Sequence, residues 1–248
     1  MPPLPGPSGR KPSSAARTLA APHHAPRTLQ HLFQVCEGLD VKLAGSCMTG
    51  TDEMAVANSA GLARYHASRV AGAKLVTMYR ALSGFASTAR VRLQDVDLEA
   101  VLERALKQCL SKRDAVTLPL GTYDVILEPE AIGELITWLG YTAFGAKSFQ
   151  ERTSFLAGRI GERVMGPEVT IYDDGTDPDG LQMPFDYEGV SKQRVLLIDR
   201  GIAAGIVYDS TYGALYQQPS TGHALSPDDV EGPLPLHLGL APGRTGRA

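Results

Sequence analysis

Apolar residues recur at helical spacing in three segments of the chain. The first segment covers residues 28–37, and Gly38 is placed to end it. The second follows Asp97, a residue suited to cap a helix, and carries apolar residues at i, i+3, i+4, i+7, i+8 and i+11. The third begins at Pro129, which suits a first helical turn, and Gly140 is its expected end. The pattern therefore predicts two or three packed helices.

Short segments typical of β-strands, separated by glycines, occupy much of the remaining chain. Before the second helix they are residues 41–47, 54–58, 62–70, 74–82 and 85–91. After it they are residues 123–127, 168–172, 194–198 and 202–208, and Asp199-Arg200-Gly201 supplies a turn between the last two. We expect mostly antiparallel pairing, and the predicted fold class is α+β.

The chain is expected to have three parts. Residues 1–28 contain seven prolines and little apolar area, so we expect a disordered arm in which His23 and His24 are solvated. Residues 29–120 form the predicted α+β part. Residues 121–248 form the predicted β-rich part.

Composition narrows the class of protein. The chain is 43% hydrophobic and 21% charged, with a formal net charge of −3, which argues against binding to nucleic acid or to an anionic membrane surface. No apolar run approaches the roughly 20 residues that span a bilayer, and no signal peptide is evident. Cys36, Cys47 and Cys109 are widely spaced, which favours reduced, buried thiols and a cytoplasmic protein.

Local motifs do not define an active site. The chain has no H-E-x-x-H, no phosphate-binding loop and no G-x-S-x-G. Carboxylates between Asp173 and Glu188 could bind a hard cation, but their spacing favours solvated loop residues. Ser220 and Thr221 lie beside His223, which allows either proton transfer or a role in shaping a loop.

Several segments, in the same order, resemble the TldD/PmbA metallopeptidase family. The core of the resemblance comprises residues 154–164, 169–175, 184–190, 197–210 and 220–225, and upstream pieces are residues 56–62 and 121–131. The resemblance extends over most of the chain beyond about residue 30. The resemblance implies an α+β fold and a role in proteolysis of unfolded peptides.

Catalytic members of this family carry an H-E-x-x-x-H segment on the helix that follows a Glu-Pro-Glu-Ala-like entry, and a downstream cysteine completes their zinc site. Here Thr137 and Thr142 fall where the histidines would be, and Trp138 falls where the glutamate would be. Threonine and tryptophan are not zinc ligands, and neither activates a zinc-bound water. The resemblance therefore implies the TldE/PmbA-like branch, with no cofactor bound by this chain and zinc held by a TldD-like partner.

On the same resemblance, two segments would build the peptide chamber or the partner surface. They are the D-x-E-G turn, with Asp186, Glu188 and Gly189, and the loop of Thr221, Gly222 and His223. Family chains extend further at both ends, so we expect a shortened chain.

Two alternatives remain open from the residues. One is a free-standing peptide-binding or regulatory module derived from the family. The other is an independent hydrolase using Ser220 or Thr221 with His223.

Overall fold

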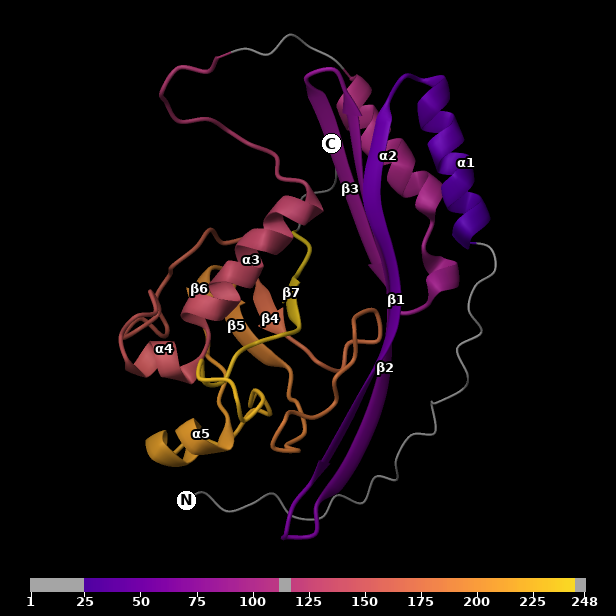
Figure 1. The fold of residues 1–248 in the computed structure, drawn as a ribbon. Coiled ribbons are helices and arrows are strands. Elements are labelled where there is room, and N and C mark those ends of the chain that lie inside the picture. Colours follow the sequence, from indigo (N-terminus) through magenta and orange to yellow (C-terminus); the bar gives the residue numbers. More distant parts are fainter. Residues whose placement is uncertain (1–24, 112–116, 244–248) are drawn as a thin grey trace. The chain divides into compact units, whose positions relative to one another are not determined.

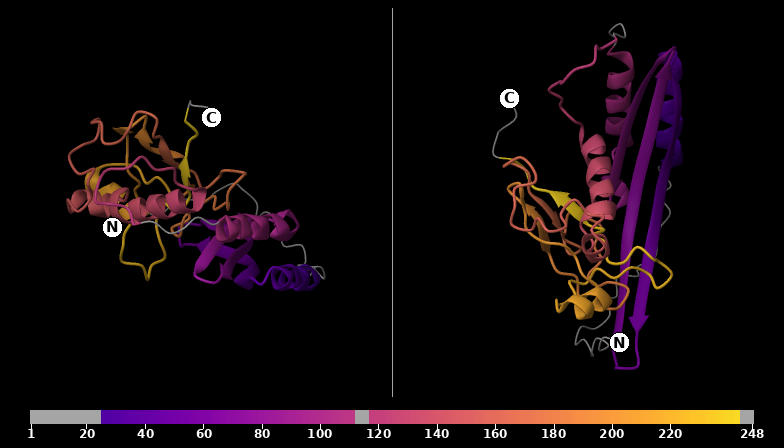
Figure 2. Two further views of the ribbon diagram at one scale, coloured as in Figure 1. Left: turned by 90° about the horizontal axis from the view of Figure 1, so that it is seen from above. Right: turned by 90° about the vertical axis from the view of Figure 1, so that its left-hand side faces the viewer.

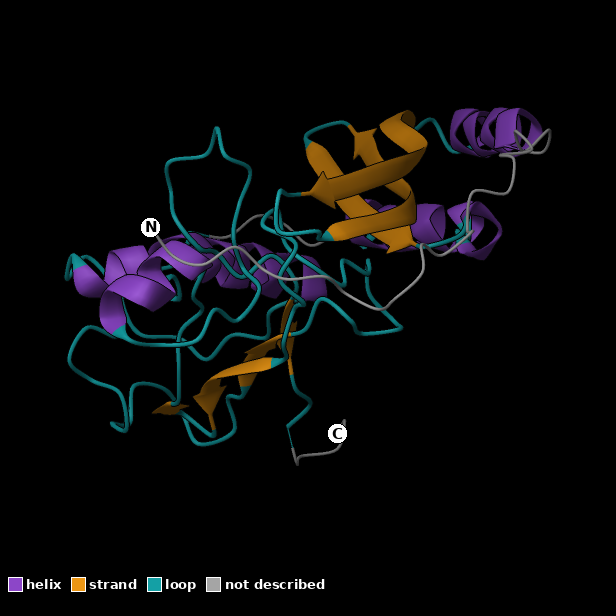
Figure 3. Ribbon diagram, turned by 90° about the horizontal axis from the view of Figure 1, so that it is seen from below, coloured by secondary structure: helices purple, strands orange, loops and turns teal. Residues whose placement is uncertain are grey.

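The computed structural model describes residues 25–111 and 117–243, which fall into two compact units. The N-terminal unit comprises residues 25–52, 67–111 and 117–126 of the described chain, and the C-terminal unit comprises residues 53–66 and 127–243. Figure 3 distinguishes the helices and strands of both units by colour. Because β1 and β2 cross the boundary, each of these strands contributes residues to both units.

The N-terminal unit is a three-stranded sheet with two helices packed on one face. The elements are α1 (Ala25–Gly38), β1 (Lys42–Ala57), β2 (Ala63–Tyr79), β3 (Leu82–Arg90), the short 3₁₀ helix Leu93–Asp95 and α2 (Leu98–Leu110), and the strand order is β1-β2-β3 (Figure 1). Leu32 of α1, Leu75 of β2 and Leu102 of α2 are buried in the same core. The helices therefore cover the same apolar face of the sheet.

Helix α2 and strand β3 approach each other unusually closely. A Cβ atom added to Gly84 in β3 would clash with the backbone carbonyl of Ala105 and would lie 2.8 Å from the backbone nitrogen of Cys109. The hydroxyl of Thr77 in β2 donates a hydrogen bond to the same Ala105 carbonyl at 2.9 Å. Backbone thus packs against backbone here, which only glycine permits.

Strands β1 and β2 form a long hairpin that continues well beyond β3, as Figure 2 makes clear. The Asn58 side chain accepts hydrogen bonds from the backbone nitrogens of Ala60 and Leu62, and Gly61 adopts a φ of 85°, so the turn is locally determined. The tip packs within the C-terminal unit. Arg64 donates to the Ser191 hydroxyl at 2.8 Å, and Leu62 lies against Gly189.

The C-terminal unit combines a four-stranded antiparallel sheet with three helices. Its elements are α3 (Pro129–Ala143), α4 (Ala146–Gln150), β4 (Ile171–Asp173), β5 (Val195–Asp199), β6 (Ile202–Ala203), α5 (Ser210–Tyr216) and β7 (Leu238–Leu240), and the strand order is β6-β5-β4-β7. Ile136 of α3, Phe144, and Ile198 of β5 are buried in one core. Among the described residues, no helix has the length and continuous apolar character needed to cross a membrane.

The α+β fold class and the antiparallel pairing are confirmed, but the five short strands predicted before the second helix are three longer ones, β1, β2 and β3. Asp97 caps α2 by accepting a hydrogen bond from the backbone nitrogen of Ala100 at 2.9 Å. The turn between β5 and β6 is formed by Arg200 and Gly201, both with positive φ. These features depend on neighbouring residues, which is why the local pattern predicts them. The expected arm at residues 1–28 lies mainly outside the described residues, and α1 already begins at Ala25.

Three predictions about individual elements are wrong. Residues 123–127 are in neither a strand nor a helix. Helix α3 passes through Gly140 and ends at Ala143, because the missing side chain at position 140 admits Leu238 of β7. The strand expected over residues 202–208 is limited to Ile202–Ala203, while α4, α5 and β7 are elements that the pattern did not predict.

Replacing Gly84 with alanine is expected to destabilise the N-terminal unit by about 2–3 kcal/mol, because α2 must move away from β3. Gly50→Ala in β1 is the matched control, since its nearest non-neighbouring atom would be 3.8 Å away. Urea denaturation of both variants measures the free energy of unfolding. Equal losses in the two variants would contradict the close packing of α2 on Gly84.

Candidate functional site

A buried polar centre lies where β4 ends beside the loop that follows α5. Its members are Asp173, Lys192 and His223, none more than 7% exposed. His223 Nε2 lies 2.7 Å from Asp173 Oδ2, and neither side chain is exposed to solvent. The other carboxylate oxygen, Asp173 Oδ1, accepts the backbone N–H of His237 at 2.6 Å. Both oxygens of Asp173 therefore have partners inside the protein.

The second ring nitrogen of His223 continues this hydrogen-bonded chain. Nδ1 lies 2.9 Å from the hydroxyl oxygen of Thr221, and that oxygen accepts the backbone N–H of Tyr208 at 2.8 Å. A neutral imidazole that donates from Nε2 to Asp173 leaves Nδ1 to accept the Thr221 hydroxyl hydrogen. The loop is pressed so closely against the backbone of Ser191 and Lys192 that only a glycine fits at position 222, where φ is 77°.

Burial and charge act in opposite directions on this centre. Burial lowers the pKa of Lys192, although the charges of Asp173 and Asp186 oppose it. Burial would raise the pKa of Asp173, but the hydrogen bond from His223 and the charge of Lys192 outweigh it and hold that pKa below its ordinary value. Burial also lowers the pKa of His223, so its imidazole is neutral near pH 7. Near pH 7 the centre thus holds an ionised carboxylate and a neutral imidazole, with Lys192 as the neighbouring basic group.

Asp186 organises the neighbouring D-x-E-G turn from within. One carboxylate oxygen accepts the backbone N–H groups of Glu188 and Val190 at 3.0 and 2.8 Å, and the other accepts that of Ala224 at 2.9 Å. Burial raises the pKa of Asp186, against these hydrogen bonds. The three bonds join the turn to the loop that carries His223.

The other residues of the turn connect it to further elements. The carboxylate of Glu188 accepts the backbone N–H of Ser210 at 3.0 Å, next to the first turn of α5. Gly189 has a φ of 80° and lies against Leu62 of the β1–β2 turn. The turn is therefore where α5 and the hairpin tip meet the C-terminal sheet region.

The six residues predicted to build a chamber or partner surface lie close together in the structure, and four of them are buried. Asp186, Gly189, Gly222 and His223 are buried, whereas Glu188 and Thr221 are partly exposed. The hydroxyl of Ser220 accepts the backbone N–H of Gly222 at 3.2 Å. Because the imidazole of His223 has no exposed surface, it cannot act as a base toward a substrate bound outside this arrangement. The contacts suit a scaffold that shapes the surrounding surface.

Helix α3 carries Thr137, Trp138 and Thr142, the positions predicted to replace the family's zinc motif, and all three are exposed. The Thr137 hydroxyl donates to the Gly133 carbonyl at 2.9 Å, and the Thr142 hydroxyl donates to the Trp138 carbonyl at 2.8 Å. Both hydroxyls thus bond to their own helix. In the described part of the chain, no three His, Cys, Asp or Glu residues gather in a way that could hold a metal ion. These residues do not fit a zinc ion.

Carboxylates of the loop between β4 and the D-x-E-G turn accept hydrogen bonds from residues of the same loop. Asp174 accepts the backbone N–H and the hydroxyl of Thr176, and Asp177 accepts the backbone N–H of Asp179. Such local turns are the usual use of aspartate in loops. The side chains are arranged as turn-forming residues and not as a set of converging ligands.

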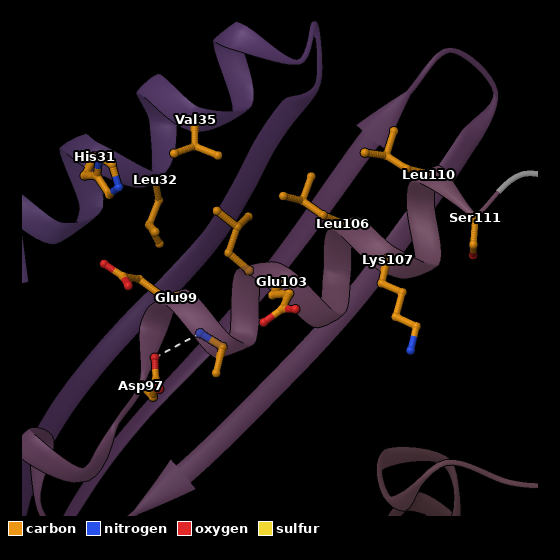
Figure 4. Close-up of a pocket in the computed structure, with 12 residues that line it drawn as sticks. His31, Leu32, Val35, Asp97, Glu99, Glu103, Leu106, Lys107, Leu110 and Ser111 are labelled. Carbon is orange, nitrogen blue, oxygen red and sulfur yellow. Dashed lines mark hydrogen bonds between the residues drawn. The ribbon is translucent and has the colours of Figure 1, made fainter.

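The N-terminal unit has a groove of about 730 Å³ between α1 and α2 (Figure 4). Leu32, Val35 and Leu106 contribute to its apolar lining, and Glu99 and Glu103 are among its charged residues. The lining holds no paired nucleophile and base. The groove therefore offers a contact surface and no catalytic arrangement.

Sequence reasoning missed Lys192 as a member of the buried centre and missed His237 as the residue whose backbone N–H binds Asp173. Lys192 follows directly after the D-x-E-G segment, but an isolated lysine gives no signal of burial. His237 packs near the centre because β7 pairs with β4, and the pattern did not predict β7. Neither residue lies in a segment that carries the family resemblance, so the sequence offers no indication of either.

Comparisons with known proteins agree with this architecture. Residues 120–246, about half of the chain, match the model of the PmbA/TldA metallopeptidase C-terminal domain. The metalloprotease TldD homolog of Haemophilus influenzae is 33% identical over 145 residues, which cover 57% of this chain and 30% of that protein. A metalloprotease of Methanothermobacter thermautotrophicus is 28% identical over 116 residues, covering 46% of this chain and 25% of that protein.

The crystal structure of TldE from Thermococcus kodakarensis superposes with a TM-score of 0.76 at 22% identity, covering 98% of this chain and 58% of that one. This chain spans about a third of the length of the curated relatives it matches. The matched domain covers most of the C-terminal unit and defines a protein with a PmbA/TldA-type C-terminal domain. The chain belongs to the TldD/PmbA metallopeptidase family.

Replacing His223 with leucine is expected to lower the free energy of unfolding by about 2–4 kcal/mol, because the buried Asp173 carboxylate loses a hydrogen-bond donor. Denaturant titration at pH 7 measures the change. Leu215→Ala, at a side chain 66% exposed, is the control and should change stability by no more than about 0.5 kcal/mol. A His223→Leu variant as stable as the control would show that the pair contributes little.

Stability is expected to fall as the pH drops from about 6.5 to about 4. Burial, with the charge of Lys192, lowers the pKa of His237 to about 4, whereas the imidazole in an unfolded chain titrates near 6.5. Between these values the unfolded state binds more protons, so protonation favours unfolding. His237→Phe should reduce the slope of unfolding free energy against pH in this window. Parallel slopes for the two proteins would refute this assignment.

Proposed function

We propose that this chain is a non-catalytic, TldE-like subunit of a TldD-type metallopeptidase complex that acts on unfolded peptides. The observation that carries the proposal is the chemistry of α3. Its threonine hydroxyls at positions 137 and 142 hydrogen bond to their own helix, and Trp138 offers no metal ligand. Zinc, and the water it activates, would then belong to a TldD-like partner.

The buried centre supports a structural role in such a complex. The pair of Asp173 and His223 and the three bonds of Asp186 hold the D-x-E-G turn and the loop at residues 220–225 in one arrangement. The exposed parts of Glu188 and Thr221 would then contribute to the chamber or partner surface. Preorganised surfaces of this kind bind a partner with less loss of entropy on association.

The likeness to TldE from Thermococcus kodakarensis supports the TldE-like fold that this role requires. The similarity to the metalloprotease TldD homolog of Haemophilus influenzae supports a role in a peptidase complex. We assign the complex to the cytoplasm, as the cysteine content predicts. Neither nucleic acid nor a membrane has a part in this proposal.

The chain, purified alone, is expected to bind less than a stoichiometric amount of zinc and to leave unfolded peptides intact. Mixed with a TldD-like chain, it should form a complex that cleaves them, because the partner would supply the metal. Metal analysis, co-purification and peptide cleavage measure these outcomes. Stoichiometric zinc together with cleavage by this chain alone would overturn the proposal.

A mixture of this chain with a TldD-like chain also distinguishes the proposed subunit from the alternative, a free-standing peptide-binding module. Light scattering of the chain with and without the TldD-like protein gives the mass of any complex. A chain that stays monomeric in the mixture and still binds unfolded peptide would favour the free-standing module.

A further inference from the structure

Helix α3 exposes a stripe of large apolar side chains. Leu135, Trp138 and Tyr141 are 52%, 61% and 52% exposed, and their spacing of three residues keeps them close together on the helix surface. Ile136 and Gly140 face the core. The helix is thus packed on one side, and it presents two aromatic rings and a leucine on the other. Figure 1 shows α3 on the C-terminal unit.

The two aromatic rings form a defined arrangement with a carboxylate. The ring centroids of Trp138 and Tyr141 lie 6.3 Å apart at an interplanar angle of 54°. The indole N–H donates to Glu134 Oε1 at 3.0 Å, which holds the carboxylate beside the rings. That bond uses one oxygen, so Oε2 can accept a hydrogen bond from a ligand.

The charged residues of α3 itself are all acidic. Residues 127–146 contain Glu128, Glu130 and Glu134 and no lysine, arginine or histidine. A cation over the face of a tryptophan or tyrosine is attracted by the ring, and a nearby carboxylate adds an ion pair. An arginine side chain satisfies both, because its planar guanidinium stacks on rings and donates in a fork. Leu135 adds apolar surface for a neighbouring side chain.

The size of the stripe favours a short peptide segment over a folded subunit. From residue 135 to residue 141 the helix rises about 9 Å, which matches two or three residues of extended chain. A stable interface between folded proteins buries over roughly 1,000 Å². A second copy of the chain would bring its own Glu128, Glu130 and Glu134 against the first, which like-charge repulsion disfavours.

We propose that Glu134, Trp138 and Tyr141 form a binding site for an unfolded peptide segment that carries an arginine, or a lysine, next to an apolar residue. The site gives the proposed complex a preference among peptide substrates, and that role rests on the proposed function. The binding chemistry itself belongs to this chain alone.

Trp138 is the only tryptophan of the chain, so its fluorescence reports directly on the site. The full chain is titrated with an end-blocked Gly-Leu-Arg-Leu-Gly peptide and with the same peptide carrying citrulline in place of arginine. Citrulline keeps the shape of arginine without its charge. We expect the arginine peptide to change Trp138 emission with an affinity roughly 5-fold or more above that of the citrulline peptide.

Variants locate the effect. Glu134→Gln should remove most of the difference between the two peptides, and Tyr141→Ala should weaken both. Leu215→Ala, which shortens an exposed leucine on α5 of the same unit, is the matched control and should leave both affinities unchanged. The difference should also shrink as salt rises from 50 to 500 mM, since it depends on charge.

Equal affinities for the two peptides, or a preference that survives Glu134→Gln, would overturn the site. An emission change that depends on protein concentration without peptide would also overturn it, because a second copy would then cover the stripe. Co-purification of the Glu134→Gln variant with a TldD-like chain tests the proposed function separately. If the complex forms but the chain shows no preference for arginine, only the proposed peptide site is wrong. If the chain prefers arginine but no complex forms, only the proposed subunit role is wrong.

Discussion

The contact between Asp173 and His223 is the interaction on which the C-terminal unit depends. It joins the end of β4 to the loop after α5, and the same carboxylate binds the backbone before β7. A carboxylate without exposed surface is costly unless each oxygen has a partner, and here each has one. Lys192 supplies the neighbouring positive charge. Three segments far apart in the sequence therefore meet at one charged group.

This arrangement explains why several conspicuous polar residues are not chemically available. Thr221 and His223 resemble a nucleophile and a base in the sequence, but the hydroxyl oxygen of Thr221 accepts the backbone N–H of Tyr208 and the imidazole of His223 is enclosed. Asp186 looks like a candidate ligand, yet three backbone N–H groups occupy it. Polar side chains that satisfy buried backbone are needed for the fold, so their adjacency in sequence is a weak guide to catalysis.

Features that depend on residues close together in the sequence were easier to predict than features that depend on residues far apart. The cap of α2 at Asp97 and the turn at Arg200 and Gly201 depend on residues next to them, and both were predicted. Gly140 was mistaken for a helix end because the reason for its lack of a side chain is Leu238, distant in sequence. The centre was missed for the same reason, since fifty residues separate Asp173 from His223. The segments that carry the family resemblance were recognisable, but their physical roles required the fold.

Helix α3 exposes both threonines and aromatic rings, and this combination bears on function. Its threonine hydroxyls satisfy the helix backbone, so they do not compete for a ligand. Its core-facing residues, among them Ile136, Gly140 and Ala143, pack the helix against the sheet without Trp138 or Tyr141. Trp138 and Tyr141 are therefore not needed for the core, and a folded chain that leaves such rings in water does so at a cost in apolar exposure. A ligand that covers the rings would recover that cost, so a helix unsuited to zinc can still contribute to handling a peptide.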